Sequence, residues 1–409
     1  MAWQCKLSSS DFSAPGEVDQ NAAALHIGRM WVPRTIEARV RQAVRHHPAV
    51  AIVGPRQSGK TSLLKRLFPG ARYVSLDDPG TQAIVLEDPN ALLASKEPLI
   101  LDEAQAAPEI FPYLKAAIDQ DRRPGRFLMT GSQNLLLSAS IGESLAGRAV
   151  YVSLLPFDFR EIASSGKGAE LWLRRASYPE PFLNPAAEES WLSGYLQTYV
   201  QRDVRQVAQV SDLRDFSRFL RVLALRNGQM LNMAEIANDV SVAPNTVKRW
   251  ISVLEASYQV FLLEPFFSNQ TKRIIKTPKL YFVEPSLAWK LAGGRPRDQG
   301  LVLEATLVAA IHRWAAHTEA WRMFYFRTKE GAEVDLVLEA TRKETTRIAA
   351  EIKHTRTFTP ALLRGLKAFS RLHEPARSVL ISNIGRPPPV GHTHFQSPAA
   401  FLEWLSEER

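Results

Sequence analysis

The chain has a single cysteine, Cys5, among its 409 residues. One thiol cannot form an intramolecular disulfide, so the composition favours a reducing compartment. Long apolar runs are missing as well, and none approaches the roughly 18 residues that a membrane-spanning helix needs. The N-terminus also lacks the basic-then-apolar layout of a signal peptide. From these absences we expect a cytoplasmic protein with no membrane partner.

Acidic residues are outnumbered, with 42 Asp and Glu against 51 Lys and Arg, for a formal net charge of +9. A basic balance permits contact with nucleic acid but does not require it. The hydrophobic content of 45% is ordinary for a soluble globular protein. A chain of this length predicts two or three domains. The weakly patterned residues 1–29 are expected to be disordered.

The best-marked stretch is AVAIVGPRQSGKTS, residues 49–62. It fits G-x-x-x-x-G-K-[ST], the phosphate-binding loop, in which glycines let the backbone approach phosphate oxygens. Backbone N–H groups and the following helix N-terminus supply positive potential. Lys60 would reach the β- and γ-phosphates, and the Thr61 hydroxyl would hold Mg²⁺. The predicted nucleotide-binding residues are Gly54, Pro55, Arg56, Gln57, Ser58, Gly59, Lys60, Thr61 and Ser62.

Apolar strands alternate with helical segments across residues 30–165, the predicted ATPase core. This alternation is typical of an α/β fold with a parallel sheet and crossover helices. Each expected strand is short and apolar, as is usual when helices cover both faces of a sheet. The expected strands lie near residues 49–53, 72–76, 98–102, 126–130 and 149–153.

The third expected strand reads PLILDEAQ and ends in two carboxylates. This is a Walker B pattern, in which Asp102 supports the Mg²⁺ shell and Glu103 polarises the attacking water as general base. The pattern is weak alone. Behind a matching phosphate loop in the same alternating unit it becomes strong.

Polar residues also follow the fourth strand. Ser132 and Gln133 are candidates for sensing the γ-phosphate, and a simple turn is an equally good interpretation of either residue. Arg148 precedes the fifth strand, where an arginine is placed to reach the nucleotide of a neighbouring subunit in a homo-oligomer. The alternative for Arg148 is a cation favoured by the dipole at a helix C-terminus.

Several segments together resemble a family of prokaryotic AAA-type ATPases in which a C-terminal domain of unknown function follows the ATPase. The segments are GPRQSGKT, LILDEAQ, LMTGSQN, ESLAGR and LLPFDFREI, followed downstream by YLQTYVQRDV, TPKLYF, GAEVDLVLE and AAEIKHTRT. The resemblance covers roughly residues 30–385. It implies ATP and Mg²⁺ as cofactors. The family commonly has Gly-Gly-Tyr-Pro where this chain has Ala176-Ser177-Tyr178-Pro179.

Downstream of the ATPase core, LLPFDFRE closes the sheet and starts a helical lid or connector that continues over residues 166–210. Residues 211–268 are predicted to form a winged helix, because LNMAEIANDVSVAPNTVKRWISVLE reads as helix, turn, helix. The stretch from Tyr258 to Phe267 would supply wing strands. Two interpretations have equal weight: the second helix enters the DNA major groove, or the module serves packing or protein contacts.

The last domain, residues 269–409, begins with the strand-like KLYFVE. Glu351 and Lys353 are two apart on a later strand, so their side chains share one face. Asp335 opens the strand before it. An Asp on one strand and Glu-x-Lys on the next resemble the PD-(D/E)xK nuclease core, in which carboxylates hold Mg²⁺ and the lysine stabilises developing charge.

Glu304, on a helix expected over residues 301–316, completes this second metal site. The alternative is a degenerate nuclease fold whose polar cluster persists as ion pairs. Glu284 lies where the family usually has Asp.

The leading functional hypothesis is an AAA-type ATPase that hydrolyses Mg²⁺-ATP and acts on DNA through its two downstream modules. A second hypothesis is a nucleotide-gated regulatory protein, such as a toxin–antitoxin or defence component, without nuclease activity. A third is a metal-dependent DNA nuclease that uses ATP as a switch.

Overall fold

The computed structural model describes residues 31–132, 144–166, 173–198, 213–266, 277–342, 346–373, 377–385 and 389–408. The chain divides into two compact units, residues 1–32 and 33–409, and every element named below lies in the second. The disorder predicted for residues 1–29 concerns a segment outside the described residues.

Five parallel strands form the first sheet, in the order β2-β3-β4-β1-β5. Their bounds are β1 (Ala49–Val53), β2 (Arg72–Ser75), β3 (Leu99–Asp102), β4 (Phe127–Gly131) and β5 (Ala149–Ser153). All five strands that the sequence predicts are present, with ends shifted by at most one residue. The predicted five-stranded parallel sheet is therefore confirmed.

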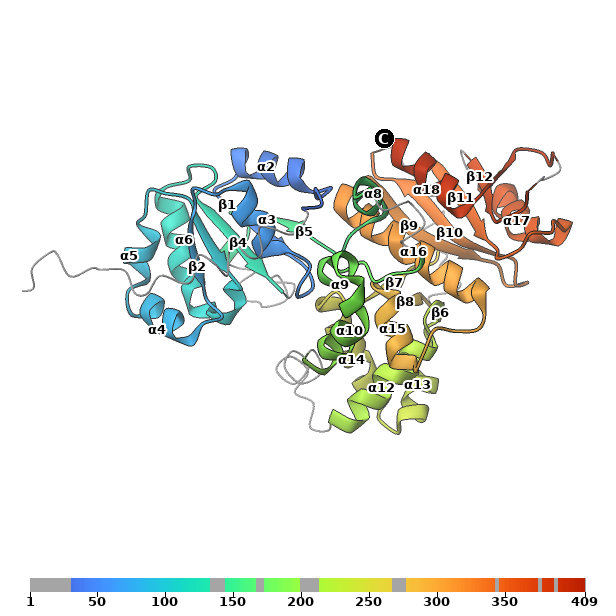
Figure 1. Cartoon of the computed structure of the whole chain (residues 1–409), viewed down its shortest axis with the longest axis horizontal. Coiled ribbons are helices and arrows are strands. Elements are labelled where there is room, and N and C mark those ends of the chain that lie inside the picture. The colour runs from blue at the N-terminus through green and yellow to red at the C-terminus, as the bar shows by residue number, and fades with distance from the viewer. Residues whose placement is uncertain are drawn as a thin grey trace, which may run out of the picture. The chain divides into compact units, whose positions relative to one another are not determined.

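β1 lies inside this sheet, paired with β4 on one side and β5 on the other. All of its residues are buried. Ala51 packs into a core cluster with side chains of α6 (Phe111–Gln120). Its neighbour Ile52 points to the opposite face, because successive strand residues alternate, and α2 (Glu37–His46) contacts the strand there. Helices on both faces explain the continuous apolar strand (Figure 1).

Short helices with recognisable start signals connect the strands. α4 and α5 each begin with an aspartate followed by proline: Asp78 accepts a hydrogen bond from the Thr81 N–H, and Asp88 accepts one from the Ala91 N–H. Such side chains satisfy backbone donors that the first helical turn leaves unpaired. The remaining elements of this part are α3 (Lys60–Leu67), α4 (Pro79–Glu87), α5 (Pro89–Leu93), η1 (Ala104–Ala106) and η2 (Pro108–Ile110).

A second group of elements combines helices with a small antiparallel sheet in the order β6-β8-β7. Its helices share one apolar core, in which Phe216, Phe219 and Trp250 make edge and tilted ring contacts. The members are α9 (Pro179–Leu183), η5 (Pro185–Ala187), α10 (Glu188–Thr198), α12 (Leu213–Leu225), β6 (Gln229–Met230), α13 (Met233–Val240), α14 (Pro244–Ala256), β7 (Val260–Leu263), β8 (Lys279–Phe282) and α15 (Pro285–Ala292).

Two elements make contacts far along the chain that local periodicity does not reveal. β8, expected at the start of the last domain, pairs with β6 and β7. α8 (Phe159–Ser164), at the start of the expected lid or connector, packs against α16 (Gln299–Thr318).

The third group is a mixed sheet in the order β13-β12-β11-β10-β9. β9, β10 and β11 are antiparallel neighbours, whereas β11, β12 and β13 run parallel. Phe369 of α17 packs against one face of the sheet, together with Val337 and Ala349. The members are α16, β9 (Trp321–Arg327), β10 (Glu333–Ala340), β11 (Arg347–Ile352), η7 (Pro360–Leu363), α17 (Arg364–Leu372), β12 (Arg377–Ile381), β13 (Thr393–Gln396) and α18 (Pro398–Glu407).

Details of the sequence prediction change in this sheet. Asp335 does not open its strand but is the third residue of β10, beside a register shift between Val334 and Val337. Lys353 follows β11 directly rather than lying within it. Among the described helices, none is both long enough and apolar enough to cross a membrane.

Candidate functional site

The phosphate-loop residues form a tight turn between β1 and α3. Gln57 and Gly59 adopt positive φ angles of 61° and 95°. Gly54 lies so close to the next strand that an added Cβ would stand 2.1 Å from the Leu154 carbonyl oxygen. Lys60 is buried, and its Nζ donates to the carbonyl oxygens of Gly54 (3.1 Å) and Pro55 (2.9 Å). The glycines are therefore required by backbone geometry, and Lys60 lies over its own loop.

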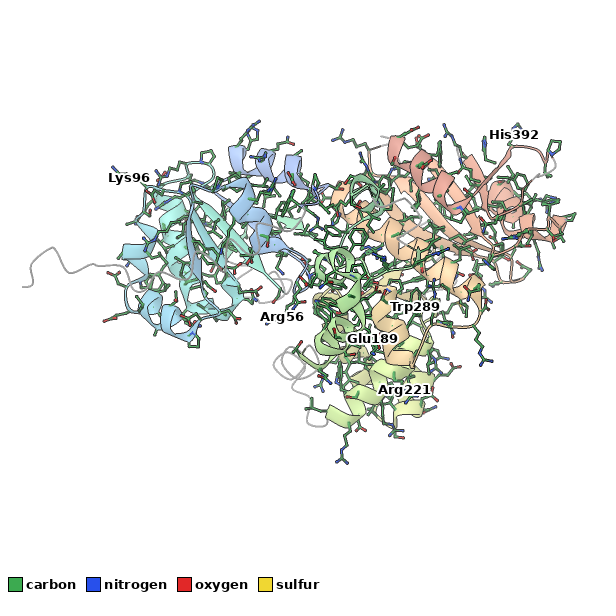
Figure 2. All side chains as sticks on the ribbon, in the orientation of Figure 1. Arg56, Lys96, Glu189, Arg221, Trp289 and His392 are labelled. Atoms are coloured by element: carbon green, nitrogen blue, oxygen red, sulfur yellow. The ribbon has the colours of Figure 1, made fainter. Side chains whose placement is uncertain are left out.

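The other predicted loop residues differ in exposure. Pro55 and Ser58 are buried, Arg56 is half-buried, and Gln57 and Ser62 are exposed. Figure 2 labels Arg56, which projects from this loop.

Asp102 connects the ends of several strands. Its Oδ1 accepts hydrogen bonds from the Thr61 hydroxyl (2.5 Å) and the Thr130 hydroxyl (2.6 Å). Its Oδ2 accepts one from the Tyr73 hydroxyl (2.8 Å). Burial and the negative charge of Asp102 raise the pKa of Tyr73, which keeps that hydroxyl a donor. The Walker A threonine and the Walker B aspartate thus share a hydrogen bond, although 41 positions separate them.

Glu103 stands in the left-handed region, with φ 52° and ψ 48°. Its N–H donates to the Thr130 hydroxyl (2.9 Å), which fixes the backbone, and its carboxylate accepts a hydrogen bond from Gln105 Nε2. The same nitrogen lies 3.0 Å from the Ser132 Oγ. A non-glycine residue with positive φ is uncommon and clusters at functional sites. The structure therefore brings Glu103 and Ser132 together through Gln105.

Three contributors to this site were not predicted. Thr130 lies inside LMTGSQN, the segment in which Ser132 and Gln133 were predicted as site residues instead. Gln105 follows the Walker B carboxylates in LILDEAQ, so its position in that motif could have indicated a role in the site. Tyr73 of β2 offered no local signal, because its contact with Asp102 depends on strand pairing.

Two further predicted residues have different outcomes. Arg148 makes a two-pronged contact with Asp119: Nε to Oδ1 at 2.8 Å and Nη2 to Oδ2 at 2.7 Å. These hydrogen bonds lower the pKa of Asp119. Gln133 lies outside the described residues.

A second polar cluster lies where β10 and β11 run side by side. Lys353 Nζ is 3.0 Å from Asp335 Oδ2 and 2.8 Å from Glu351 Oε1. Asp335 Oδ2 also accepts the Ile352 N–H at 2.8 Å. The other Glu351 oxygen, Oε2, is buried and makes no hydrogen bond to the described residues. The predicted trio Asp335, Glu351 and Lys353 thus converges, and one of its carboxylate oxygens has no hydrogen-bond partner in the described part of the chain.

The cluster carries strong pKa shifts. Burial raises the pKa of Glu351 to about 8, with a further contribution from Asp335 that Lys353 opposes. Burial alone would lower the pKa of Lys353, but the carboxylates of Asp335 and Glu351 outweigh it and raise that pKa. Such shifts are common where several charges share a buried site.

Glu304 belongs to the neighbouring part of this cluster. Its Oε1 accepts hydrogen bonds from Lys279 Nζ (3.1 Å) and the Tyr281 hydroxyl (2.7 Å), both on β8. Lys279 also pairs with Glu333 at 2.6 Å. Burial and the charge of Asp335 raise the pKa of Glu304. The structure therefore places Glu304 near Asp335, with its contacts made to β8, which sequence reasoning did not foresee.

Glu284 has a structural role. It is buried and caps α15, where its Oε1 accepts the Ser286 N–H at 3.0 Å. Its Oε2 accepts hydrogen bonds from the N–H (2.8 Å) and the hydroxyl of Ser177. Ser177 and Glu284 are therefore joined by hydrogen bonds although 107 positions separate them.

A third polar group is fully buried. Within the described ranges, Asp158, Glu161 and His317 are the residues whose ligand atoms lie within 4.8 Å of one another. Their oxygen and nitrogen atoms are already engaged: Asp158 Oδ2 contacts His317 Nδ1 (2.8 Å) and the Thr35 hydroxyl (2.7 Å). This set does not fit a cation, because hydrogen bonds occupy its acceptors.

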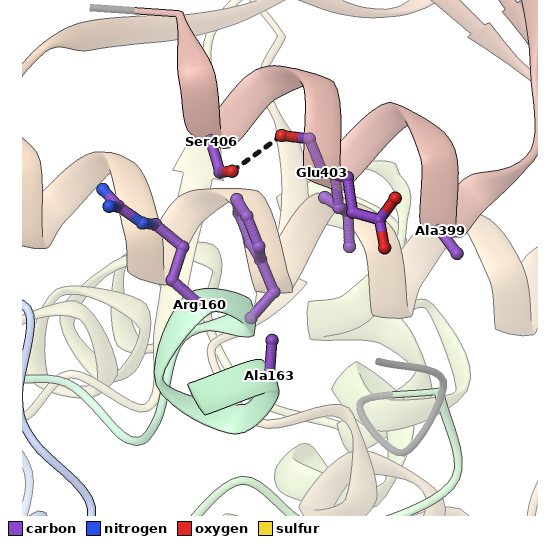
Figure 3. Close-up of a pocket in the computed structure, with 7 residues that line it drawn as sticks. Arg160, Ala163, Ala399, Glu403 and Ser406 are labelled. Atoms are coloured by element: carbon purple, nitrogen blue, oxygen red, sulfur yellow. Dashed lines mark hydrogen bonds between the residues drawn. The ribbon is translucent and has the colours of Figure 1, made fainter. Parts of the chain in front are cut away.

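A small pocket of about 200 Å³ lies between α8 and α18 (Figure 3). Its lining residues are Phe159, Arg160, Ala163, Ala399, Leu402, Glu403 and Ser406. Figure 3 shows the Ser406 hydroxyl directed at the Glu403 carbonyl oxygen, to which it donates at 2.6 Å. This volume is below the roughly 300–1,000 Å³ usual for small-molecule sites, so we assign the pocket no ligand.

Comparisons with known proteins agree with this geometry. A family model described as an AAA domain matches residues 46–163. Two models described as domains of unknown function match residues 168–298 and 299–401. Residues 46–163 therefore form an AAA-type domain of the P-loop ATPase class.

Relatives span most of the chain. An uncharacterised protein of Mycobacterium tuberculosis is 33% identical over 370 residues, which are 87% of this chain and 82% of that protein. A Mycobacterium bovis protein matches with the same values. An uncharacterised protein of Methanocaldococcus jannaschii is 24% identical over 339 residues, 74% of this chain and 75% of that protein. The chain belongs to the same family as the two mycobacterial proteins.

Solved structures are more distant. A Walker-type ATPase of Pyrococcus abyssi is 16% identical, covers 64% of this chain and 96% of its own, and has a TM-score of 0.43. The replication initiator DnaA, bound to AMPPCP and single-stranded DNA, is 13% identical, with coverages of 54% and 86% and a TM-score of 0.29.

The raised pKa of Glu351 predicts a pH-dependent stability. A native pKa of about 8 against an ordinary 4.5 means that the native state binds more protons than the unfolded chain between these values. Stability should therefore fall as pH rises through that window, by at most about 1.4 kcal/mol per pH unit. We expect Glu351→Gln to unfold at a higher temperature than wild type at about pH 9 and to show a much smaller difference at about pH 5.

Thermal unfolding followed by circular dichroism checks this prediction. Glu339→Gln is the matched control, because Glu339 is a buried carboxylate on β10 that pairs with Arg322 and Arg347 instead. An equal difference between Glu351→Gln and wild type at both pH values would contradict the raised pKa.

Proposed function

We propose that the chain binds Mg²⁺-ATP at the loop from Gly54 to Thr61 and hydrolyses it. The observation that carries this proposal is the shared carboxylate of Asp102, which receives the hydroxyls of both Thr61 and Thr130. A hydroxyl next to a carboxylate at the carboxyl edge of a parallel sheet is the oxygen donor set that Mg²⁺ takes beside nucleotide phosphates. Bound Mg²⁺ would supply neutralisation of phosphate charge.

Residues around the loop would perform the other steps of hydrolysis. Lys60, which now donates to carbonyl oxygens of its own loop, has the length to exchange those oxygens for phosphate oxygens. Glu103 accepts a proton from the attacking water, and its backbone is fixed for that task by Thr130. Gln105 holds the Glu103 side chain toward Ser132, the candidate γ-phosphate sensor.

Arg148 is proposed to act on the nucleotide of a neighbouring copy in a homo-oligomer. Its guanidinium is partly exposed and pairs with Asp119 through two hydrogen bonds. An exposed ion pair is weak, so a phosphate group can replace Asp119 at little cost. A two-pronged donor of this kind suits phosphoryl oxygens as well as carboxylates.

Glu103→Gln should reduce ATP turnover by at least about 100-fold, because the general base is lost, and should leave ATP binding intact. Lys60→Ala should lose binding itself. Phosphate release and the binding of fluorescent mant-ATP, measured on the same samples, separate the two effects. Measurements at high protein concentration, with and without DNA, allow an oligomer to form.

Glu109→Gln is the control, since Glu109 is an exposed carboxylate just beyond the Walker B segment. If wild-type protein binds ATP and never turns it over under these conditions, hydrolysis is rejected in favour of a nucleotide-gated regulatory protein.

DNA is the proposed macromolecular partner. From α12 to β8, the elements follow the order helix–strand–helix–helix–strand–strand around the sheet β6-β8-β7, which supports a winged helix. α14 buries Val247, Trp250 and Ile251 and exposes Lys248 and Arg249. The second helix of such a module is the one that enters the major groove. Figure 2 shows that Arg221 projects outward from α12 in the same module.

A second candidate activity, metal-dependent cleavage of DNA, is favoured by the cluster at β10 and β11. The order α16-β9-β10-β11-α17-β12 and the convergence of Asp335, Glu351 and Lys353 support a PD-(D/E)xK fold. The Oε2 of Glu351 has no hydrogen-bond partner among the residues that the structure describes, and it fits a divalent cation because a buried carboxylate oxygen needs a partner. Asp335 and Glu351 would hold the ion, and Lys353 would stabilise negative charge developing on the phosphate.

Asp335→Asn should abolish any cleavage of duplex DNA in the presence of Mg²⁺ or Mn²⁺, because one metal-binding carboxylate is lost. A fluorescently end-labelled duplex on a denaturing gel measures this. Glu339→Gln, on the same strand, should cut like wild type. If wild-type protein never cuts DNA with either ion, the nuclease candidate fails and the cluster consists of structural ion pairs.

Lys248→Glu tests the proposed contact of α14 with DNA. This variant should weaken retention of the duplex in a mobility-shift assay.

A further inference from the structure

Arg34 is a buried arginine whose side chain contacts the phosphate loop at the Ser58 carbonyl oxygen. Its Nη1 donates to the Ser58 carbonyl oxygen at 2.7 Å, and its Nη2 donates to the Leu155 carbonyl oxygen at 2.7 Å. Its Nε faces Glu161 Oε1 at 3.1 Å. The guanidinium carbon lies 4.9 Å from the centre of the Phe157 ring. Both Nη groups are therefore hydrogen-bonded to backbone carbonyls, and the Nε makes an ion-pair contact with Glu161 without a hydrogen bond among the described residues.

The contact with Ser58 determines which way one peptide of the loop faces. A trans peptide is planar, so its C=O and N–H point in opposite directions. Because the Ser58 carbonyl faces Arg34, the Gly59 N–H points to the opposite side of that peptide, away from Arg34. That N–H is one of the donors that a phosphate-binding loop offers to its anion. Gly59 has a φ of 95°, a conformation that glycine adopts freely and that leaves the peptide free to rotate unless it is held.

Arg34 is in turn fixed by the capping box of α8. Glu161 Oε2 accepts the Asp158 N–H (3.0 Å), and Glu161 Oε1 accepts the Thr35 N–H (2.6 Å). Asp158 Oδ1 accepts the Glu161 N–H (3.0 Å), and its Oδ2 accepts the Thr35 hydroxyl. Burial would raise the pKa of Asp158, but hydrogen bonds from His317, the Glu161 N–H and Thr35 outweigh it and lower that pKa. Asp158 is thus held as an anion, and Glu161 connects Arg34 to the capping box.

His317 of α16 completes the network. The Leu155 N–H donates to its Nε2 at 3.0 Å, so the ring proton lies on Nδ1 and is donated to Asp158 Oδ2. The Leu155 residue is therefore held from two sides, its carbonyl by Arg34 and its N–H by His317. Ser58, Arg34, Leu155 and His317 form a continuous chain of buried hydrogen bonds from the phosphate loop to α16.

We propose that Arg34 is a positioning residue for nucleotide: it turns the Ser58–Gly59 peptide so that its N–H faces the phosphates, and it links that peptide to His317 on α16. The proposal rests on the proposed nucleotide site. It gives the ATPase core a direct connection to the helix that also carries Glu304.

Arg34→Lys tests the positioning role, because a lysine keeps the charge but cannot span both carbonyls. Mant-ATP binding with Mg²⁺ should weaken about 10-fold, the scale expected for losing a charged hydrogen bond. Arg126→Lys is a matched control: Arg126 is also buried and donates to the carbonyl oxygens of Leu93 and Ala117, away from the phosphate loop. It should leave the dissociation constant within about 2-fold of wild type.

Amide hydrogen exchange of peptides covering residues 54–61, measured without nucleotide, decides the same question independently of ATP binding. Exchange there should be faster in Arg34→Lys than in wild type and unchanged in Arg126→Lys. Unchanged exchange in Arg34→Lys would overturn the proposal, whether or not the wild-type protein binds ATP. A wild-type protein that binds no ATP would refute the proposed function instead. Equal weakening of mant-ATP binding in both variants would also overturn it, because it would show a general loss of stability.

His317 tests the link to α16. His317→Gln keeps a donor for Asp158 and an acceptor for the Leu155 N–H, whereas His317→Leu keeps the approximate volume and neither function. Loop exchange should be faster in His317→Leu and close to wild type in His317→Gln. Wild-type exchange in His317→Leu would overturn the link between the phosphate loop and α16.

Discussion

The arrangement of the candidate ATPase site depends on the carboxylate of Asp102 and the hydroxyls it accepts. β3, β4 and the loop after β1 end at the same edge of a parallel sheet, and Asp102 joins all three through Thr61 and Thr130. Thr130 also receives the N–H of Glu103. One threonine therefore contacts both the Asp102 carboxylate and the backbone of Glu103, the proposed base. Since β4 separates β1 from β3 in the sheet, the position of Thr130 follows directly from the strand order.

The same logic of shared carboxylates recurs elsewhere in the chain. Asp158 and Glu161 hold Arg34 and Thr35, and Asp335 and Glu351 share Lys353. Charges buried in pairs cost less than single buried charges, because each provides the other with the partner that water would have supplied. The two clusters differ in whether all their carboxylate oxygens have hydrogen-bond partners among the described residues. The acceptors around Asp158 are occupied, whereas Glu351 keeps a buried oxygen without a partner among the described residues, and only the second arrangement favours a metal ion.

The sequence was most informative where function requires consecutive residues. The five strands were predicted to within one residue at each end, because local periodicity defines them, and the loop from Gly54 to Thr61 and the pair Asp102-Glu103 lie at the ends of these strands. The convergence of Asp335, Glu351 and Lys353 was also predictable, since neighbouring strands and a two-residue spacing determine it. Residues whose roles depend on distant partners were missed. Tyr73 contacts Asp102 only because β2 pairs with β3. Lys279 contacts Glu304 only because β8 lies in the three-stranded sheet β6-β8-β7.

We propose that the Asp102 network organises ATP hydrolysis, and single-turnover hydrolysis by a Thr130→Val variant would measure its contribution. Valine keeps the shape of threonine but can neither donate to Asp102 nor accept from the Glu103 N–H. We predict that the variant binds Mg²⁺-ATP within a few-fold of wild type and hydrolyses it at least about 10-fold more slowly, the scale of two lost hydrogen bonds. Hydrolysis at the wild-type rate would show that the Asp102 network does not organise the reaction.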